Sequence, residues 1–344
     1  MISDKTIIRS KAPLRIGLAG GGTDVSPYSD NFGGAVLNIT IDKYAYATLI
    51  PRDDEIINLK SYDLGINESL NTQSYLKVDN ELSLLKGVYN RVVKDFELDP
   101  LSFDLITETD VPKGSGLGSS STLTVAILGA FVEWLNLPLG EYDIAQLAHS
   151  IEREDLAMPG GKQDHYASTF GGVNFIEFEK SKVIVNPLRV RSRHLNELNY
   201  NLLLYYTGTS RVSQDIISSQ IENFEKGKND ALEGAHKVKS IAYAMKDSLL
   251  TGNIDKIGDL LDLGWSNKKK MSNSISNSSI DNIYQIAKQN GATGGKISGA
   301  GGGGFFIIYA PAVSKHKIAE ALKPYGGEFW TFNFSNKGLV KWRI

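Results

Sequence analysis

Cysteine is absent from this 344-residue chain, and long apolar runs and excess charge are absent too. Without cysteine there can be no disulfide framework and no thiolate zinc site. No apolar run approaches the roughly 18 residues of a membrane-spanning helix, and residues 1–5 lack the apolar segment of a signal peptide. A net charge of −2 gives no basic field for nucleic acid. We therefore expect a cytoplasmic protein without a nucleic-acid or membrane partner.

Glycine, in contrast, is plentiful, with 34 residues, and much of it falls in three clusters. These lie within residues 11–24, 112–122 and 294–304, next to apolar strand-like or helix-like stretches. Glycine is costly inside regular elements, so such clusters mark tight turns or close backbone approach. We predict that the three clusters form one composite site, with independent structural turns as the alternative.

The second cluster reads Pro-Lys-Gly-Ser-Gly-Leu-Gly-Ser-Ser-Ser-Thr and runs into an apolar stretch at residues 123–135. That stretch predicts a helix, whose N-terminus and preceding glycine amides favour a polyanion, while the hydroxyls offer oxygen ligands to a metal. The Walker A pattern and the GxGxxG spacing are both missing, which argues against a P-loop NTPase and a dinucleotide-binding fold. A flexible turn is the alternative. The predicted nucleotide-binding residues are Lys113, Gly114, Ser115, Gly116, Leu117, Gly118, Ser119, Ser120 and Ser121.

Strand-like and helix-like stretches mix along the whole chain, which predicts the α+β class. We expect strands at residues 44–50, 101–107, 201–206, 304–310 and 329–334, and helices at 82–96, 142–154 and within 213–250. The polar stretch at residues 189–199 favours a boundary between two domains, 1–190 and 191–344. The three consecutive lysines at 268–270 favour a solvated loop or helix end, with a phosphate patch as the alternative.

Three motifs now carry a resemblance. They are Lys-Ala-Pro-Leu-Arg-Ile-Gly-Leu-Ala-Gly-Gly-Gly-Thr-Asp at 11–24, the loop at 112–122, and Gly-Lys-Ile-Ser-Gly-Ala-Gly-Gly at 295–302. In this order they resemble the motifs of the GHMP kinases, the superfamily of galactokinase, homoserine kinase, mevalonate kinase and phosphomevalonate kinase. The resemblance implies an N-terminal domain like ribosomal protein S5 domain 2 and a ferredoxin-like C-terminal domain. It also implies an active site in the cleft between them.

Within the superfamily, Gly-Gly-Thr-Asp at residues 21–24 resembles the kinases that phosphorylate an anomeric hydroxyl. The C-terminal pattern resembles the bacterial D-glycero-D-manno-heptose 7-phosphate kinase group. The resemblance implies transfer of a phosphoryl group from ATP, with Mg²⁺, to O1 of that heptose phosphate, giving the 1,7-bisphosphate for nucleotide-activated heptose and surface polysaccharide. L-fucose kinases share the Gly-Gly-Thr-Asp element, so a neutral-sugar kinase is the alternative. A non-catalytic sugar sensor on the same fold is a third reading.

The resemblance also assigns chemical roles. Asp164 takes the position of the catalytic base, and Arg15 that of the cation that stabilises developing charge. Ser120 and Glu152 take the positions of the Mg²⁺ ligands, with Glu154 as a competing assignment because the spacing to Asp164 varies among relatives. The presence of the base, the cation and both metal ligands argues against the sensor. Simpler alternatives are a turn residue for Asp164 and a surface carboxylate for Glu152.

The sugar itself is expected to meet Gly22, Thr23 and Asp24, whose carboxylate can accept hydrogen bonds from two hydroxyls. A helix N-cap is the alternative for Thr23 and Asp24. Gly301, in the third motif, is a further predicted substrate contact.

A phosphorylated sugar also needs a cation. Arg211 is our candidate because it follows a predicted strand and a guanidinium pairs bidentately with phosphate oxygens. Lys162 and Lys296 are the other candidates for this cation. The alternative for Arg211 is an ion pair on the surface without a role in binding. A homodimer is compatible with the sequence, but nothing in it requires one.

Overall fold

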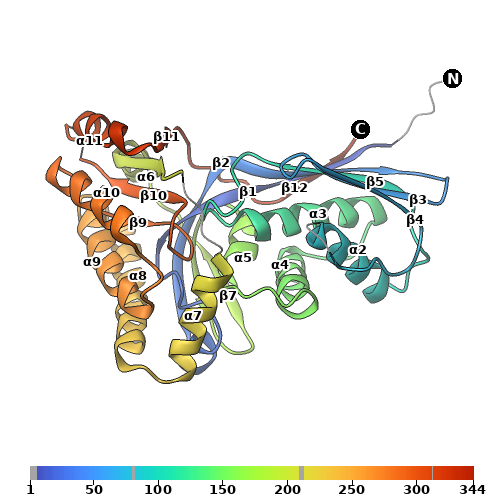
Figure 1. Cartoon of the computed structure of the whole chain (residues 1–344), viewed down its shortest axis with the longest axis horizontal. Coiled ribbons are helices and arrows are strands. Elements are labelled where there is room, and N and C mark those ends of the chain that lie inside the picture. The colour runs from blue at the N-terminus through green and yellow to red at the C-terminus, as the bar shows by residue number, and fades with distance from the viewer. Residues whose placement is uncertain (1–5, 80–81, 209–212, 312) are drawn as a thin grey trace.

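The computed structural model describes residues 6–79, 82–208, 213–311 and 313–344. Two β-sheets and the helices packed on them make up an elongated molecule (Figure 1). The strands are β1 Ile8–Ala19, β2 Gly34–Pro51, β3 Ile56–Ser61, β4 Ile66–Asn71, β5 Phe103–Thr109, β6 Val173–Phe178, β7 Val183–Pro187, β8 Leu202–Tyr206, β9 Gly294–Ile297, β10 Phe305–Tyr309, β11 Glu328–Trp330 and β12 Val340–Arg343.

The helices lie between these strands. They are α1 Tyr28–Phe32, α2 Ser83–Asp95, α3 Ser119–Leu135, α4 Glu141–Ser150, α5 Gln163–Phe170, α6 Ser192–Asn201, α7 Ser213–Glu225, α8 Asn229–Thr251, α9 Lys256–Met271, α10 Ser278–Gln289 and α11 Lys315–Leu322, with a π-helical turn η1 Ile151–Asp155 and a 3₁₀ turn η2 Lys323–Tyr325. Among the described residues, none of the helices has the length and apolarity to cross a bilayer.

The first sheet has the strand order β12-β1-β2-β5-β3-β4, and β6 and β7 extend it from β2. The long strand β2 is its centre because its first half pairs with β6 and its second half with β5. Helices α2 to α5 lie together on one side of this sheet (Figure 1), and α3 packs against both β1 and β2. The apolar α3 is buried on nearly every side, as its sequence requires.

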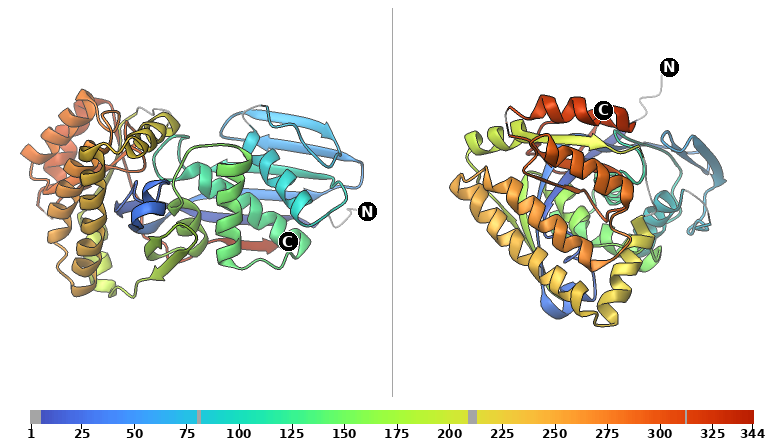
Figure 2. Two further views of the ribbon diagram at one scale, coloured as in Figure 1. Left: turned by 90° about the horizontal axis from the view of Figure 1, so that it is seen from below. Right: turned by 60° about the vertical axis from the view of Figure 1, so that its left-hand side comes forward.

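The second sheet has the order β11-β8-β10-β9, with every neighbouring pair antiparallel. In chain order this is fourth-first-third-second, the βαββαβ arrangement predicted for a ferredoxin-like domain. Helices α7 to α10 come between its first two strands, and α8 packs along α9 (Figure 2).

An apolar core joins the two sheets. Alternate residues of β8 and β10, such as Leu204 and Ile307, pack with Leu14 and Ile16 of the first sheet. The intervening residues of β8 and β10 face another core that includes α10 and α11. Because both faces of the second sheet are buried, its strands read as continuous apolar runs rather than alternating ones.

The chain ends on the first sheet. Strand β12 pairs with β1 over Ile8 to Lys11, so the last described strand returns to the sheet that contains the first. The fold class, α+β with two sheets, agrees with the prediction. The division into two domains at residue 190 stays a prediction. Because β12 returns to the first sheet, the chain passes between the two sheets a second time after residue 190.

Several elements differ from the sequence predictions. The polar stretch 189–199 holds most of α6, in which His194 and Leu198 are buried. The predicted strand at 329–334 is only the short β11, followed by one bridge between Ile41 and Phe334. The predicted helix at 142–154 is α4 followed by the π-helical turn η1. The end of a short strand such as β11 is decided by pairing partners that are distant in sequence, and a local sequence pattern does not contain that information.

Gly294 marks a close contact that a mutation can test. A Cβ atom at this position would lie 1.8 Å from the carbonyl oxygen of Gly258, where β9 crosses α9. We expect Gly294→Ala to destabilise the protein by about 1–3 kcal/mol, because backbone cannot move aside as a side chain can. Gly264→Ala is the control, since its Cβ would meet only Ile241 at 3.8 Å. Equal chemical denaturation midpoints for the two variants would contradict this packing.

Candidate active site

The three glycine clusters meet in space, as predicted. A Cβ atom on Gly116 would lie 2.5 Å from the Ser298 carbonyl oxygen, and one on Gly299 would lie 2.7 Å from the Gly116 carbonyl oxygen. A Cβ atom on Gly304 would approach the Ser115 carbonyl oxygen to 2.4 Å. The second and third clusters therefore touch through backbone, which explains why they are glycine.

Lys296 connects the first cluster to the third. Its Nζ donates to the carbonyl oxygen of Gly17 at 2.8 Å, and the side chain is buried. Burial holds the pKa of Lys296 well below its usual value, and the charges of Lys268 and Arg15 add to this effect. Because the amine is engaged with β1, a direct role in binding the substrate phosphate does not fit this conformation.

The predicted catalytic pair is in contact. Arg15 on β1 donates through Nε to Asp164 Oδ1 at 2.6 Å, and its second terminal nitrogen lies 2.6 Å from the same oxygen. Its other terminal nitrogen donates to the Gly116 carbonyl oxygen at 2.7 Å. Asp164, in the first turn of α5, lies against the predicted nucleotide loop at residues 112–122, because a Cβ on Gly118 would come within 2.9 Å of its carboxylate. The base position, the cation and the loop thus form one unit.

The nucleotide loop has the geometry of an anion site. All three of its glycines, Gly114, Gly116 and Gly118, have positive φ angles of 75° to 81°, which other residues rarely adopt. In the described part of the chain no side chain caps the N-terminus of α3, so its first amides remain available to a ligand. Lys113 is exposed at the mouth of the loop, whereas Leu117 is buried in the core and offers only backbone.

Ser120 and Glu152, the predicted magnesium ligands, are in contact, and an ion held by both would replace the hydrogen bond between them. Ser120 Oγ donates to Glu152 Oε1 at 3.1 Å, close to the roughly 3 Å between neighbouring ligands of an octahedral ion with bonds of about 2.1 Å. Glu154 points elsewhere, since it accepts a hydrogen bond from Ser150 on the surface. The π-helical turn that contains Glu152 is a feature often found at functional sites.

Glu152 is the centre of a buried network. Its carboxylate accepts hydrogen bonds from Ser121 at 2.8 Å and Thr124 at 2.9 Å, and it lies 3.0 Å from His165 Nε2 and 2.9 Å from Arg153. Burial alone would raise the pKa of Glu152, but the neighbouring His165 and Arg153 outweigh it and hold that pKa below its usual value. The carboxylate therefore stays ionised, as a metal ligand must be.

Asp24 is fixed by the protein. Its Oδ1 accepts hydrogen bonds from the Gly22 amide at 3.0 Å and Gln163 Nε2 at 3.2 Å, and its Oδ2 accepts one from the Gln163 amide at 3.1 Å. Gly161 is required beside it, because a Cβ there would lie 2.0 Å from Oδ2. These three hydrogen bonds use three of the about four acceptor positions of the carboxylate, which is 1% exposed.

The hydroxyl of Thr23 is bound to the protein backbone. Its hydroxyl donates to the Gly20 carbonyl oxygen at 2.8 Å and accepts from the Ala35 amide at 3.1 Å. The side chain is completely buried. Thr23 therefore holds the loop in shape, and a sugar contact through its hydroxyl does not fit this conformation.

The remaining predicted substrate residues divide into three cases. Gly22 and Gly301 have positive φ and permit close approach, of Met271 to Gly22 and of the Ile275 carbonyl oxygen to Gly301. Lys162 Nζ lies 3.3 Å from Asp30 Oδ1, and its side chain is 16% exposed. Arg211 lies outside the described residues.

Gln163 and Lys268 also lie among these residues, although the sequence did not indicate them. Gln163 binds Asp24 through both its backbone and its side chain. Lys268 is buried on the face of α9 that also buries Leu261 and Trp265, so the preference for a solvated helix end was wrong for this lysine. A lysine at a position where the helical period requires an apolar residue was the available signal.

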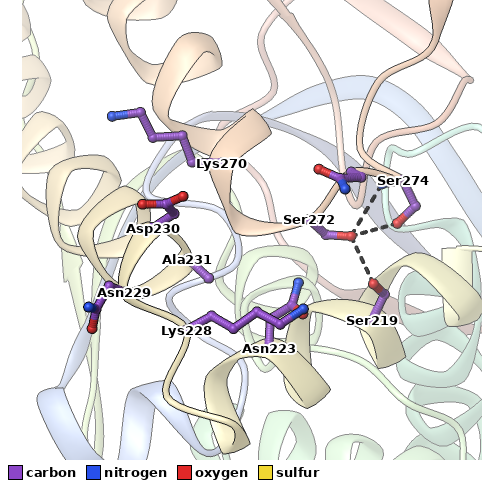
Figure 3. Close-up of a pocket in the computed structure, with 10 residues that line it drawn as sticks. Ser219, Asn223, Lys228, Asn229, Asp230, Ala231, Lys270, Ser272 and Ser274 are labelled. Atoms are coloured by element: carbon purple, nitrogen blue, oxygen red, sulfur yellow. Dashed lines mark hydrogen bonds between the residues drawn. The ribbon is translucent and has the colours of Figure 1, made fainter.

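A separate polar hollow of about 610 Å³ lies nearby, between α7, the start of α8 and the end of α9 (Figure 3). The hydroxyls of Ser219, Ser272 and Ser274 are joined in a chain along its wall, as the dashed lines show. Met271, which contacts Gly22, immediately precedes Ser272. Of the predicted site residues that the structure describes, none lines this hollow.

Comparison with known proteins places this geometry in a family. The model of the GHMP kinases N terminal domain matches residues 83–172, and that of the GHMP kinases C terminal matches residues 245–327. The chain is 46% identical to D-glycero-alpha-D-manno-heptose 7-phosphate kinase of Campylobacter jejuni, over 98% of this chain and 99% of that one.

A solved structure of a D-glycero-D-manno-heptose 1-phosphate kinase from Bacteroides thetaiotaomicron aligns with a TM-score of 0.84 and 41% identity, covering 98% of this chain and 99% of that one. L-fucokinase/L-fucose-1-P guanylyltransferase of Bacteroides fragilis is 28% identical over 97% of this chain, which spans 38% of that protein. From its two matched domains and its full-length similarity, the chain belongs to the GHMP kinases.

Proposed function

We propose that this protein transfers the γ-phosphoryl group of ATP to O1 of D-glycero-D-manno-heptose 7-phosphate, giving the 1,7-bisphosphate. The observation that carries the chemistry is the Arg15–Asp164 pair, held against the glycine loop of a GHMP kinase. The relative of 46% identity supports the choice of sugar.

Asp164 is the proposed base. Phosphoryl transfer depends mainly on alignment and on charge neutralisation, so a fixed carboxylate beside the phosphate loop suits the task. Arg15 holds Asp164 Oδ1 from two nitrogens, which leaves Oδ2 to accept the proton of the sugar hydroxyl. An anomeric hydroxyl is more acidic than an ordinary alcohol, so Asp164 has to orient it more than to deprotonate it.

Ser120 and Glu152 are the proposed ligands of Mg²⁺. Their oxygens are 3.1 Å apart at the start of α3, directly after the loop proposed to hold the phosphates. When bound there, the ion would neutralise phosphate charge. The hydrogen bonds of Ser121 and Thr124 keep the Glu152 carboxylate turned toward this position.

Asp24 and Lys162 are the proposed contacts of the sugar and its phosphate. The free acceptor position of Asp24 suits one sugar hydroxyl, next to Gln163 and one residue from the base. Lys162 offers a cation at the edge of the same loop, partly balanced by Asp30. Charge balance supports this arrangement, because a sugar phosphate would otherwise approach two carboxylates.

The test is ADP release with Mg-ATP across several acceptors. The panel contains D-glycero-D-manno-heptose 7-phosphate, its 1-phosphate isomer, mannose 6-phosphate and L-fucose. The isomer and L-fucose are included because one similar protein is named a heptose 7-phosphate kinase, another a heptose 1-phosphate kinase and a third an L-fucokinase. We expect the highest kcat/KM for the heptose 7-phosphate. A higher kcat/KM for the 1-phosphate or for L-fucose would support a sugar kinase but contradict the heptose 7-phosphate as its substrate.

A further inference from the structure

Lys268 is a buried lysine that is neither a proposed catalytic residue nor a proposed ligand-binding residue. It is 3% exposed and lies in the last turn of α9, on the helix face that packs toward β9. Its Nζ donates to the carbonyl oxygen of Gly299, in the third glycine cluster, at 2.5 Å. A buried ammonium is costly unless other groups compensate its charge, so its surroundings are informative.

Four charged groups from four parts of the fold are electrostatically coupled to Lys268. Asp24 comes from the loop after β1 and Asp164 from α5, and both favour the charged lysine. Arg15 on β1 and Lys296 on β9 oppose it. Lys268 is therefore part of the same electrostatic cluster as the proposed base and the proposed sugar contact.

The ammonium also approaches the sugar loop, the segment of residues 20–24 that contains the proposed sugar contact Asp24. A Cβ atom on Gly21 would lie 3.6 Å from Lys268 Nζ and 3.7 Å from Gln163 Nε2, so the two side chains converge on one point of the loop. An ammonium has three N–H donors, and within the described ranges the hydrogen bond to Gly299 uses one. The remaining donors are on an ammonium whose positive charge both Asp24 and Asp164 favour.

We infer that Lys268 is a positioning residue of the phosphoryl-transfer reaction, which holds the third glycine cluster against the sugar loop and balances the carboxylates of Asp24 and Asp164. This inference rests on the proposed function and deepens it. Without the ammonium, an anionic sugar phosphate would approach the carboxylates of Asp24 and Asp164 with one positive charge fewer nearby. The expected consequence is weaker binding of the sugar phosphate rather than of ATP.

The proton on Lys268 gives this role a signature. Burial lowers the pKa of Lys268 to about 8, although Asp24 and Asp164 oppose the shift. The positive charge is thus present below this pH and is lost above it. Since kcat/KM reports the ionisation of the free enzyme, we expect kcat/KM for the sugar phosphate to fall above about pH 8. Lys268→Arg keeps its charge at any such pH, so this decline should disappear.

The experiment compares three variants with the wild-type enzyme in steady-state kinetics on the heptose 7-phosphate. Lys268→Met is expected to raise the KM for the sugar about 10- to 100-fold, as the loss of a charged hydrogen bond does, with a smaller change in kcat and in the KM for ATP. Lys269→Met is the matched control, because Lys269 pairs with Asp281 at the surface. Its kinetics should match those of the wild type. Circular dichroism checks that each variant is folded.

The outcomes separate the two claims. An active wild type together with equal kinetics of Lys268→Met and Lys269→Met would overturn the inference alone. An unchanged alkaline decline in Lys268→Arg would do the same, even if Lys268→Met fails to fold. If the wild type does not phosphorylate the heptose 7-phosphate, the proposed function is lost, and this inference is lost with it.

Discussion

Asp164→Asn is expected to lower kcat by about 10²- to 10⁴-fold, the usual contribution of a positioned base. The amide oxygen can still accept the hydrogen bonds of Arg15, so the pair and the loop beside it should keep their geometry. The amide nitrogen, however, cannot accept the proton of the attacking hydroxyl. The variant should therefore bind ATP like the wild type while turning over very slowly, which calorimetry and ADP release measure separately.

Asp155→Asn provides the control for this experiment. Asp155 pairs with Arg91 and is 35% exposed, away from the glycine loops. We expect its kcat to stay within about twofold of the wild type, since surface changes of this kind are worth about 0.5 kcal/mol or less. A kcat of Asp164→Asn close to that of the control would remove Asp164 from the mechanism.

Glu152→Gln is expected to damage both stability and metal use. The new amide nitrogen would face groups that now donate hydrogen bonds to the carboxylate, among them Ser121 and His165. The guanidinium of Arg153 would also lose the negative charge with which it pairs. Removing one member of such a pair costs about 3–5 kcal/mol. The midpoint of urea unfolding should fall accordingly, and the Mg²⁺ concentration needed for half-maximal activity should rise.

The variant Glu154→Gln tests which of the two carboxylates, Glu152 or Glu154, is the Mg²⁺ ligand, a choice that the sequence left open. Glu154 is exposed and accepts one hydrogen bond from Ser150, so its replacement should change stability by no more than about 0.5 kcal/mol. It should also leave the Mg²⁺ dependence as in the wild type. The opposite ranking, with Glu154→Gln the more damaged variant, would assign the metal position to Glu154.

The sequence predicted the parts of the site that local chemistry dictates. Glycines at positions of positive φ and of backbone contact had to be glycine, so their clusters pointed to the meeting of three loops. Arg15 and Asp164 followed from the family resemblance, and the structure brings them into contact. The apolar α3 was predictable because its composition permits no exposed face.

Other features depend on packing that a single sequence does not reveal. Lys268 looked like one of three solvated lysines, and only the position of α9 against β9 and the glycine loops buries it. Thr23 was predicted to bind sugar, but the backbone of Gly20 and Ala35 takes up its hydroxyl. The strand β12 was missed since its partner β1 is more than 300 residues away in the chain.

The most direct test of the account is to identify the product by ³¹P NMR after incubation with Mg-ATP and D-glycero-D-manno-heptose 7-phosphate. The account predicts a second phosphate signal on the sugar that couples to the anomeric proton, as in the 1,7-bisphosphate. With Asp164→Asn, this signal should be far weaker after the same incubation time. A new phosphate on any carbon other than C1, or no new sugar phosphate from the wild-type enzyme, would contradict the proposed reaction.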